Sequence, residues 1–315
     1  MSDDIDDIDA TVTLDDLDEE AKTLEDEDPY LSDDDFIAVI HRLSRDLRKA
    51  SETLSEAEAR FLVSSYYNIQ EQRIRSFAQV TKLRERGSPA LVVNWLAMQS
   101  NILEGQIRAA LDRFSANHKF GKFPRSVVGI GPVITAGLIS HIHLDREPTV
   151  GAWWSFAGLN PEQKWDRSQK RPWNAQLKVL AFKAGSSFIK VRNKPNDVYG
   201  KVYYEKKQEY IARNNNGGMV ENAKKALAEK KYSRDTVAKK AYESGRLPPG
   251  HIDAMARRYA AKLFMAHMWE CCYRIEYRKA PPLPYPIVHL KGHTHYIPPP
   301  NWEAFMPEET LEDAG

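Results

Sequence analysis

Helical periodicity across residues 55–117 constrains the fold of this chain more than any other feature. Ser55 with Glu58 three residues later is a capping box, which predicts the start of a helix. Ser88-Pro89 predicts a second start, with proline in the first turn. Because only Arg86-Gly87 separates the two, we expect an antiparallel pair or coiled coil. Its second helix would carry one apolar stripe for a core or dimer seam, formed by Leu91, Trp95, Met98, Ile102, Ile107, Leu111 and Phe114.

Charge divides the chain into a basic body between two acidic ends. Residues 1–36 hold 17 Asp or Glu and a single basic residue, Lys22, while residues 302–315 hold five acids and no Lys or Arg. The body 37–301 therefore holds 44 Lys or Arg against 22 Asp or Glu, a net charge of +22. Such a body is typical of a protein that binds a polyanion, because neutralised phosphates release counterions. An ordinary basic protein with a solubilising tail is the alternative.

The acidic N-terminus predicts disorder over residues 1–31, since it has no aromatic residue before Tyr30 and no sustained apolar period. Such a tail either folds back on the basic body as a nucleic-acid mimic or keeps the protein in solution. No window is apolar enough for a membrane span, and the acidic start is not a secretory signal. The only cysteines, Cys271 and Cys272, are adjacent and imply no disulfide framework. We expect a cytoplasmic protein of a bacterium or a phage-infected host.

The sharpest local motif is Gly129-Ile130-Gly131-Pro132 within residues 124–145, followed by an amphipathic stretch. This is the pattern of a helix-hairpin-helix, in which two glycines allow a tight turn and proline opens the second helix. Amides at that helix N-terminus can then bind a phosphate, helped by the helix dipole. The interaction would read the nucleic-acid backbone and not its sequence. A plain tight turn between two packed helices is the alternative.

A polar segment downstream mixes cations with tryptophan. Such a mixture suits phosphate contact combined with base stacking, whereas a solvated loop is the bland alternative. The residues singled out for nucleic-acid contact are Lys164, Trp165, Arg167, Lys170, Arg171 and Trp173.

The order of the motifs resembles the C-terminal domain of the DEDD insertion-sequence transposases, the bridge-RNA-guided recombinases. The likeness covers about residues 125–285, with 214–245 as an insertion, and implies DNA binding in recombination and transposition. The matching segments are Gly129 to Ile142 for a GIGP-type turn, Ser155 to Pro161 for a YAGL(N/D)P segment, Lys170-Arg171 for a basic SKRG segment, Tyr203-Tyr204-Glu205, and the helix from His251 to Lys262.

Two features depart from that family. Its nuclease-like domain, whose carboxylates hold metal for strand cleavage, has no counterpart here. No cofactor is evident, and Mg²⁺ would enter only with a nuclease partner that supplies its own site. The family's catalytic serine falls on Gln169 when the match is anchored on Lys170-Arg171, and on Lys170 when it is anchored on Leu177. Ser168 is the nearby candidate nucleophile, although no activating base is visible in the sequence.

A histidine cluster near the C-terminus is the one candidate metal site. His289, His293 and His295 could hold zinc with a fourth ligand, but their spacing matches no closed zinc motif. Surface histidines in an extended tail are the default interpretation.

The sequence therefore predicts a mostly α-helical protein. It would combine a helical arm with a helix-hairpin-helix domain like the transposase C-terminal domain. The expected parts are an acidic disordered tail at 1–31, a helical arm or coiled coil at 32–120, the helix-hairpin-helix domain at 121–285, and an extended tail at 286–315.

The sequence is compatible with three functions. The first is a DNA-binding protein of a phage or mobile element, in which Gly129, Ile130 and Gly131 present amides to phosphate. It would form homo-oligomers through the arm, and structured RNA is an alternative ligand. The second is a transposase or recombinase subunit completed by a separate nuclease partner. The third is a structural or assembly protein that reuses the fold.

Overall fold

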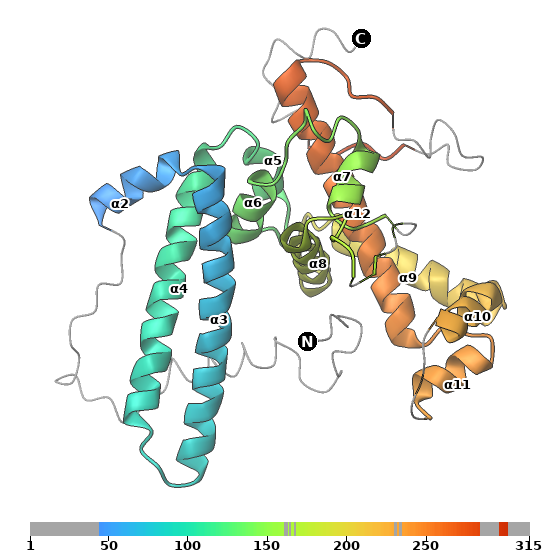
Figure 1. The fold of residues 1–315 in the computed structure, drawn as a ribbon, viewed down its shortest axis with the longest axis horizontal. Coiled ribbons are helices and arrows are strands. Elements are labelled where there is room, and N and C mark those ends of the chain that lie inside the picture. The colour runs from blue at the N-terminus through green and yellow to red at the C-terminus, as the bar shows by residue number, and fades with distance from the viewer. Residues whose placement is uncertain are drawn as a thin grey trace. The chain divides into compact units, whose positions relative to one another are not determined.

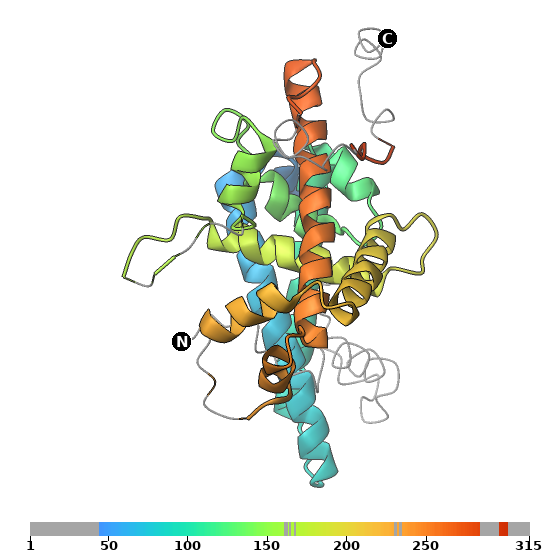
Figure 2. The same cartoon turned by 90° about the vertical axis from the view of Figure 1, so that its right-hand side faces the viewer.

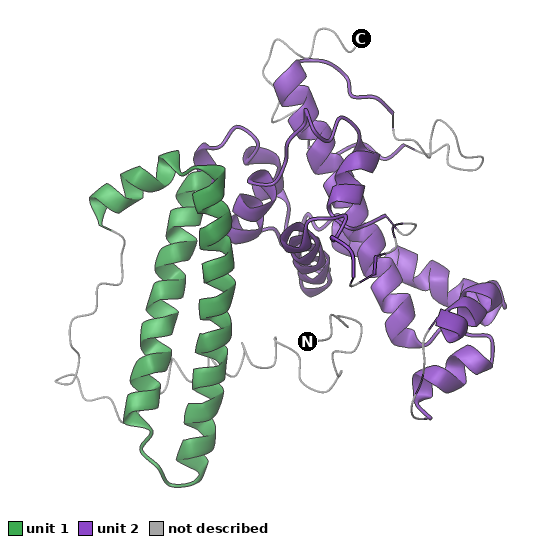
Figure 3. Ribbon diagram, in the orientation of Figure 1, with its two compact units in different colours: residues 1–114 green, residues 115–315 purple. Residues whose placement is uncertain are grey.

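The computed structural model describes residues 44–160, 163, 165–166, 168–229, 232, 235–283 and 296–301. Within these residues every regular element is a helix and no strand is present (Figure 1). The predicted mostly α-helical class is thereby confirmed. No helix in the described part of the chain combines the length and apolarity needed to cross a membrane. The chain divides into two compact units, residues 1–114 and 115–315, which Figure 3 colours separately. The predicted acidic tail and the three histidines of the C-terminal cluster lie outside the described residues.

Unit 1 is built on the predicted capping box. The Ser55 hydroxyl accepts from the Glu58 amide at 3.2 Å, and the Glu58 carboxylate accepts from the Ser55 amide at 2.8 Å. The Ser55 hydrogen bonds lower the pKa of Glu58, because they favour its charged form. A short helix precedes the cap. The elements here are α2 (Arg45–Ala50), the 3-10 turn η2 (Ser51–Thr53) and α3 (Glu56–Glu85).

The turn that follows α3 corrects one prediction. Gly87 adopts φ 78°, and the amides of Gly87 and Ser88 bond to the carbonyls of Arg84 and Leu83, which is a Schellman motif. Ser88-Pro89 therefore belongs to the end of α3, and the next helix, α4 (Leu91–Asn117), begins two residues later than predicted. The Ser88 amide already donates to the Leu83 carbonyl at the end of α3, so Ser88 does not cap α4 as predicted.

α3 and α4 lie side by side in opposite directions (Figure 1), an arrangement we call the α3–α4 arm. Small side chains let the helices approach, since buried Phe77 packs against Ala97. A buried ion pair joins them, with Arg73 Nε 2.7 Å from a Glu104 carboxylate oxygen and each side chain 10% exposed. Gln70 donates to the other oxygen at 3.0 Å.

The apolar stripe predicted on α4 does not form one buried face. Leu111 and Phe114 are buried, whereas Leu91 and Trp95 are 60% and 58% exposed. The reason is geometric, because residues at mixed spacings of three to five drift around a helix of 3.6 residues per turn. The face that meets α3 consists of small and polar residues, including Asn94, Ala97, Ser100 and Glu104.

Unit 2 is organised around one long helix, α12, against which α7, α8 and α9 pack (Figure 2). The rings of Phe188, Tyr199 and Phe264 meet at centroid distances of 4.9 to 5.4 Å, which places the core where α8, α9 and α12 converge. The helices of unit 2 are α5 (Lys122–Ser126), α6 (Pro132–Ile139), α7 (Val150–Phe156), α8 (Ala175–Lys190), α9 (Tyr199–Asn215), α10 (Val220–Glu229), α11 (Val237–Glu243) and α12 (Pro249–Tyr277).

The segment predicted as an insertion, 214–245, folds as α10 and α11. A cluster that includes Met219, Ala223, Tyr242 and Leu247 fills the space between them. The Asn214 side chain closes the segment, because it donates to the Leu247 carbonyl at 3.0 Å and accepts from the Leu247 amide at 2.9 Å. One buried amide therefore joins the two ends of this segment.

A C-terminal segment, residues 296–301, is held on α12 by a buried histidine. The His267 ring contacts the Tyr199 hydroxyl at 2.8 Å through Nδ1 and the Ile297 carbonyl at 2.9 Å through Nε2. Because a carbonyl only accepts, Nε2 is the donor to Ile297, whereas the Tyr199 hydroxyl can donate to Nδ1 or accept from it. Burial lowers the pKa of His267 to about 4.

This histidine makes the stability of the protein depend on pH. The unfolded chain takes up a proton below about pH 6.5 while the folded His267 stays neutral down to about pH 4, so acid favours unfolding. We expect the wild type to lose about 2 kcal/mol of unfolding free energy through this group between about pH 7 and pH 5. Urea unfolding at both pH values measures the loss. His267→Gln should lose less by that amount, and an equal loss in both proteins would contradict the assignment.

Candidate nucleic-acid interface

The segment predicted as a helix-hairpin-helix folds as α5, a turn over residues 127–131, and α6. Gly129 adopts φ 94°, in the region that favours glycine. Gly131 is the N-cap of α6, with Pro132 in the first turn as predicted. The turn packs against the C-terminal part of α8, since the Ser187 hydroxyl donates to the Gly129 carbonyl at 2.5 Å.

The available amides differ from those expected. The Ile130 amide donates to the Val127 carbonyl at 3.0 Å and the Ile130 side chain is buried, so this residue does not offer its amide to a ligand. Helix geometry instead leaves the first-turn amides of α6, Val133 and Ile134, without an acceptor in the helix. Gly131 is exposed beside them and no atom lies within 4 Å of an added Cβ there. The amides of this turn that lack a helical acceptor are therefore those at the N-terminus of α6.

Substitution by alanine should destabilise the protein at Gly129 but not at Gly131. In Gly129→Ala the new Cβ would lie 2.9 Å from a Val191 methyl at a positive φ, so we expect unfolding free energy to fall by about 1–3 kcal/mol. Gly131→Ala has open space and an ordinary φ of −84°, so it should stay within about 0.5 kcal/mol of wild type. Urea unfolding of both variants tests this, and equal losses would show that the turn differs from the one described.

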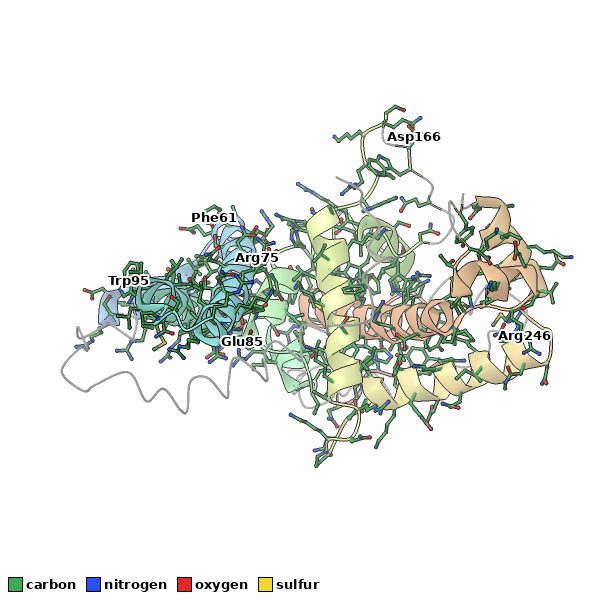
Figure 4. The ribbon with its side chains drawn as sticks, turned by 90° about the horizontal axis from the view of Figure 1, so that it is seen from below. Phe61, Arg75, Glu85, Trp95, Asp166 and Arg246 are labelled. Carbon is green, nitrogen blue, oxygen red and sulfur yellow. The ribbon has the colours of Figure 1, made fainter. Side chains whose placement is uncertain are left out.

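The basic loop between α7 and α8 is anchored at both ends. α7 ends in a Schellman motif, with the Gly158 amide bonded to Ser155 and the Leu159 amide bonded to Trp154. Trp173 packs over Gly158, where an added Cβ would come within 2.8 Å of the indole. The Asn174 side chain caps α8 by accepting from the Leu177 amide at 3.0 Å. The loop projects from the helices of unit 2, with Asp166 at its outer end (Figure 4).

The two tryptophans of the loop each carry a cation. The Arg171 guanidinium lies 4.6 Å from the Trp165 ring, and Lys178 Nζ lies 4.6 Å from the Trp173 ring. The indoles meet edge to face at 6.2 Å. One face of each indole therefore holds a cation, so the tryptophans position positive charge in this loop. Lys170 is exposed beside them, and Lys164 and Arg167 lie outside the described residues.

Ser168, the candidate nucleophile, lies in a turn of the loop and is paired with Asp166. Its amide and hydroxyl both donate to one Asp166 carboxylate oxygen, at 2.8 and 2.6 Å, which is an Asx turn. The Ser168 hydrogen bonds lower the pKa of Asp166, which makes its carboxylate a weaker base. The geometry gives Ser168 a structural role in the loop.

Two cations on α12, Arg258 and Lys262, were not among the residues that the sequence singled out for nucleic-acid contact. Lys262 on α12 lies over the Trp154 ring at 4.3 Å, while the Trp154 indole donates to the Lys262 carbonyl at 3.0 Å. Burial and, next, the charge of Arg258 lower the pKa of Lys262. Arg258 is exposed one turn earlier, and no carboxylate within the described part of the chain pairs with either residue. Their spacing of four on one helix was the signal that could have identified them.

The last turn of α7 connects these groups. The Trp154 ring, in this turn, contacts Lys262. Gly158, four residues later, contacts Trp173, whose ring in turn carries Lys178. We call Arg171, Lys178, Arg258 and Lys262 the α7 cation cluster.

The α5–α6 turn lies elsewhere on unit 2. It contacts Ser187, nine residues beyond Lys178 on α8, which places the two on nearly opposite sides of the helix and about 14 Å apart along its axis. The structure therefore separates the two predicted binding elements.

Metal and thiol chemistry receive no support from the described residues. No group of three or more His, Cys, Asp or Glu side chains within them could hold a metal ion. Cys271 and Cys272 are buried, and burial raises the pKa of both thiols, which disfavours the reactive thiolate form. Comparison of the chain with protein-family models, with curated proteins and with solved structures finds no match.

Proposed function

We propose that this chain binds nucleic acid, DNA in the first instance, by contacting phosphates with the α7 cation cluster. One observation carries the proposal: Lys262 and Arg258 form a basic pair on α12 that no described carboxylate neutralises. Like charges four residues apart destabilise a helix, and burial adds to the cost for Lys262. A phosphate bound between them would offset both penalties.

The surroundings of the cluster support the same ligand. Tryptophan faces hold Arg171, Lys178 and Lys262 in place, so less side-chain entropy is lost when they bind. The basic body, with a net charge of +22 over residues 37–301, would attract a polyanion over a distance. The N-terminus of α6 would serve as a second, separate contact with a phosphate.

The resemblance to insertion-sequence transposases supports DNA as the ligand and a phage or mobile element as the setting. The proposed function is binding without strand cleavage, because the Ser168 hydroxyl is engaged with a carboxylate of lowered pKa.

The test is the binding of the full chain to labelled duplex, single-stranded and four-way-junction DNA, and to structured RNA, across a salt series. We expect affinity for DNA to fall steeply as salt rises, since each phosphate contact contributes about −0.9 to the slope of log affinity against log salt for duplex DNA. A chain lacking residues 1–36 should bind more tightly if the acidic tail competes for the cations. Absence of binding to any nucleic acid by both proteins would exclude the proposal, and preference for RNA would replace DNA as the ligand.

A further inference from the structure

One face of α4 exposes large apolar side chains away from α3. The exposed fractions are 60% for Leu91, 78% for Val92, 58% for Trp95, 40% for Leu96 and 45% for Leu103. Figure 4 looks along the arm and labels Trp95 on its outside. These five residues, which we call the α4 stripe, lie on one side of α4, since their helical positions fall within about 140° of one another.

The spacing of the stripe fits a partner helix. Val92, Leu96 and Leu103, with Gln99 between the last two, follow steps of four, three and four residues, which is the seam pattern of a coiled coil. Trp95 flanks this seam, and aromatic residues are enriched at protein interfaces. The partner that fits is therefore another helix with an apolar seam.

The absence of charge on the stripe indicates which helix is its partner. Residues 87–103 contain no Asp, Glu, Lys or Arg, whereas residues 71–85 of the neighbouring α3 contain six. A charge-free face is complementary to itself, since a two-fold axis brings no like charges together. An acidic or basic partner would find no opposite charge on it.

We propose that two copies of this chain pair through their α4 stripes. Taking about 150 Å² for a fully exposed side chain of this size, the five exposed fractions correspond to roughly 400 Å² in each copy. Stable complexes bury about 800 Å² per partner, so the stripe and its polar flanks predict a reversible, concentration-dependent dimer.

The experiment is sedimentation equilibrium of the nuclease-treated full chain across micromolar concentrations, at salt high enough to suppress charge effects. We expect the wild type to change from one to two copies as its concentration rises. Trp95→Glu places a charge in both halves of the interface and should raise the dissociation constant by about 100-fold or more. Phe61→Glu is the matched control, because Phe61 is 71% exposed and belongs to α3, outside the stripe. It should leave the dimer intact, and circular dichroism checks that both variants keep their helices.

A second measurement does not depend on a disruptive variant. Gln99→Cys places a thiol in the seam, whereas Cys271 and Cys272 are buried, so mild oxidation should link two copies only in this variant. A wild type that stays monomeric overturns the proposal, and that includes the outcome in which residues 1–43 of the same chain cover the stripe. The proposal is also overturned if Phe61→Glu dissociates the dimer as much as Trp95→Glu does. Failure of Gln99→Cys to cross-link would overturn it too.

Discussion

Replacing Arg258 and Lys262 together by glutamine should weaken DNA binding by roughly 30- to 100-fold at ~0.1 M salt. Both cations lie on α12, Lys262 over the Trp154 ring and Arg258 one turn earlier, and neither has a carboxylate partner in the described structure. The loss should be electrostatic, so the slope of log affinity against log salt should decrease by about two for duplex DNA. Fluorescence anisotropy with one labelled duplex over several salt concentrations measures both quantities.

The control removes two charges from another surface of unit 2. Lys224→Gln with Lys225→Gln changes two exposed lysines on α10, outside the α7 cation cluster, and should leave most of the affinity and slope unchanged. Equal losses in the two double variants would mean that binding follows net charge alone. Thermal unfolding of both proteins separates loss of binding from loss of fold. The α12 variant should not be less stable than the wild type, because it removes like charges four residues apart.

Glu104→Ala should lower the unfolding free energy by about 3–5 kcal/mol, the cost of leaving a buried charge without its partner. Glu104 joins α4 to α3 by accepting from Arg73 at 2.7 Å and from Gln70 at 3.0 Å. Removing the carboxylate leaves the Arg73 guanidinium unpaired in a site where each side chain is only 10% exposed. Urea unfolding followed by circular dichroism measures the effect on the arm.

Two further variants separate the ion pair from other causes. Arg73→Met added to Glu104→Ala removes the unpaired charge, so the double variant should recover much of the loss. Glu71→Ala breaks the exposed pair with Arg75 on the surface of α3 and should cost less than about 1 kcal/mol, because water screens that pair. If Glu104→Ala and Glu71→Ala lose equal stability, the pair between the helices is not buried in solution.

The separation of the α5–α6 turn from the α7 cation cluster changes how the two should be tested. They contact opposite sides of α8, so a variant of one leaves the geometry of the other in place. Gly131→Ala, which has room for its new methyl group, tests the turn without disturbing the cluster. Loss of affinity in Gly131→Ala and in the α12 variant would indicate two independent backbone contacts.

Local patterns in the sequence were enough to predict the helical class, the capping box of α3 and the glycine–proline turn before α6. Each depends on a few consecutive residues: Ser55 with Glu58 satisfies amides one turn apart, and Gly129 allows a backbone angle that other residues avoid. Such interactions act within a few residues of chain, so they can be recognised without knowledge of the tertiary fold.

Tertiary contacts decided what the local patterns left open. The α4 stripe is exposed because α3 packs on the opposite, small-residue face of α4, and Ile130 loses its free amide to the turn itself. Lys262 became a candidate only when folding placed Trp154 from α7 over it, across 108 positions of sequence. A cation without a nearby acid is a property of its three-dimensional surroundings, since pairing depends on which distant segments pack beside it. For that reason the sequence determined the basic character of this protein, and the tertiary structure determined which cations form the candidate binding site.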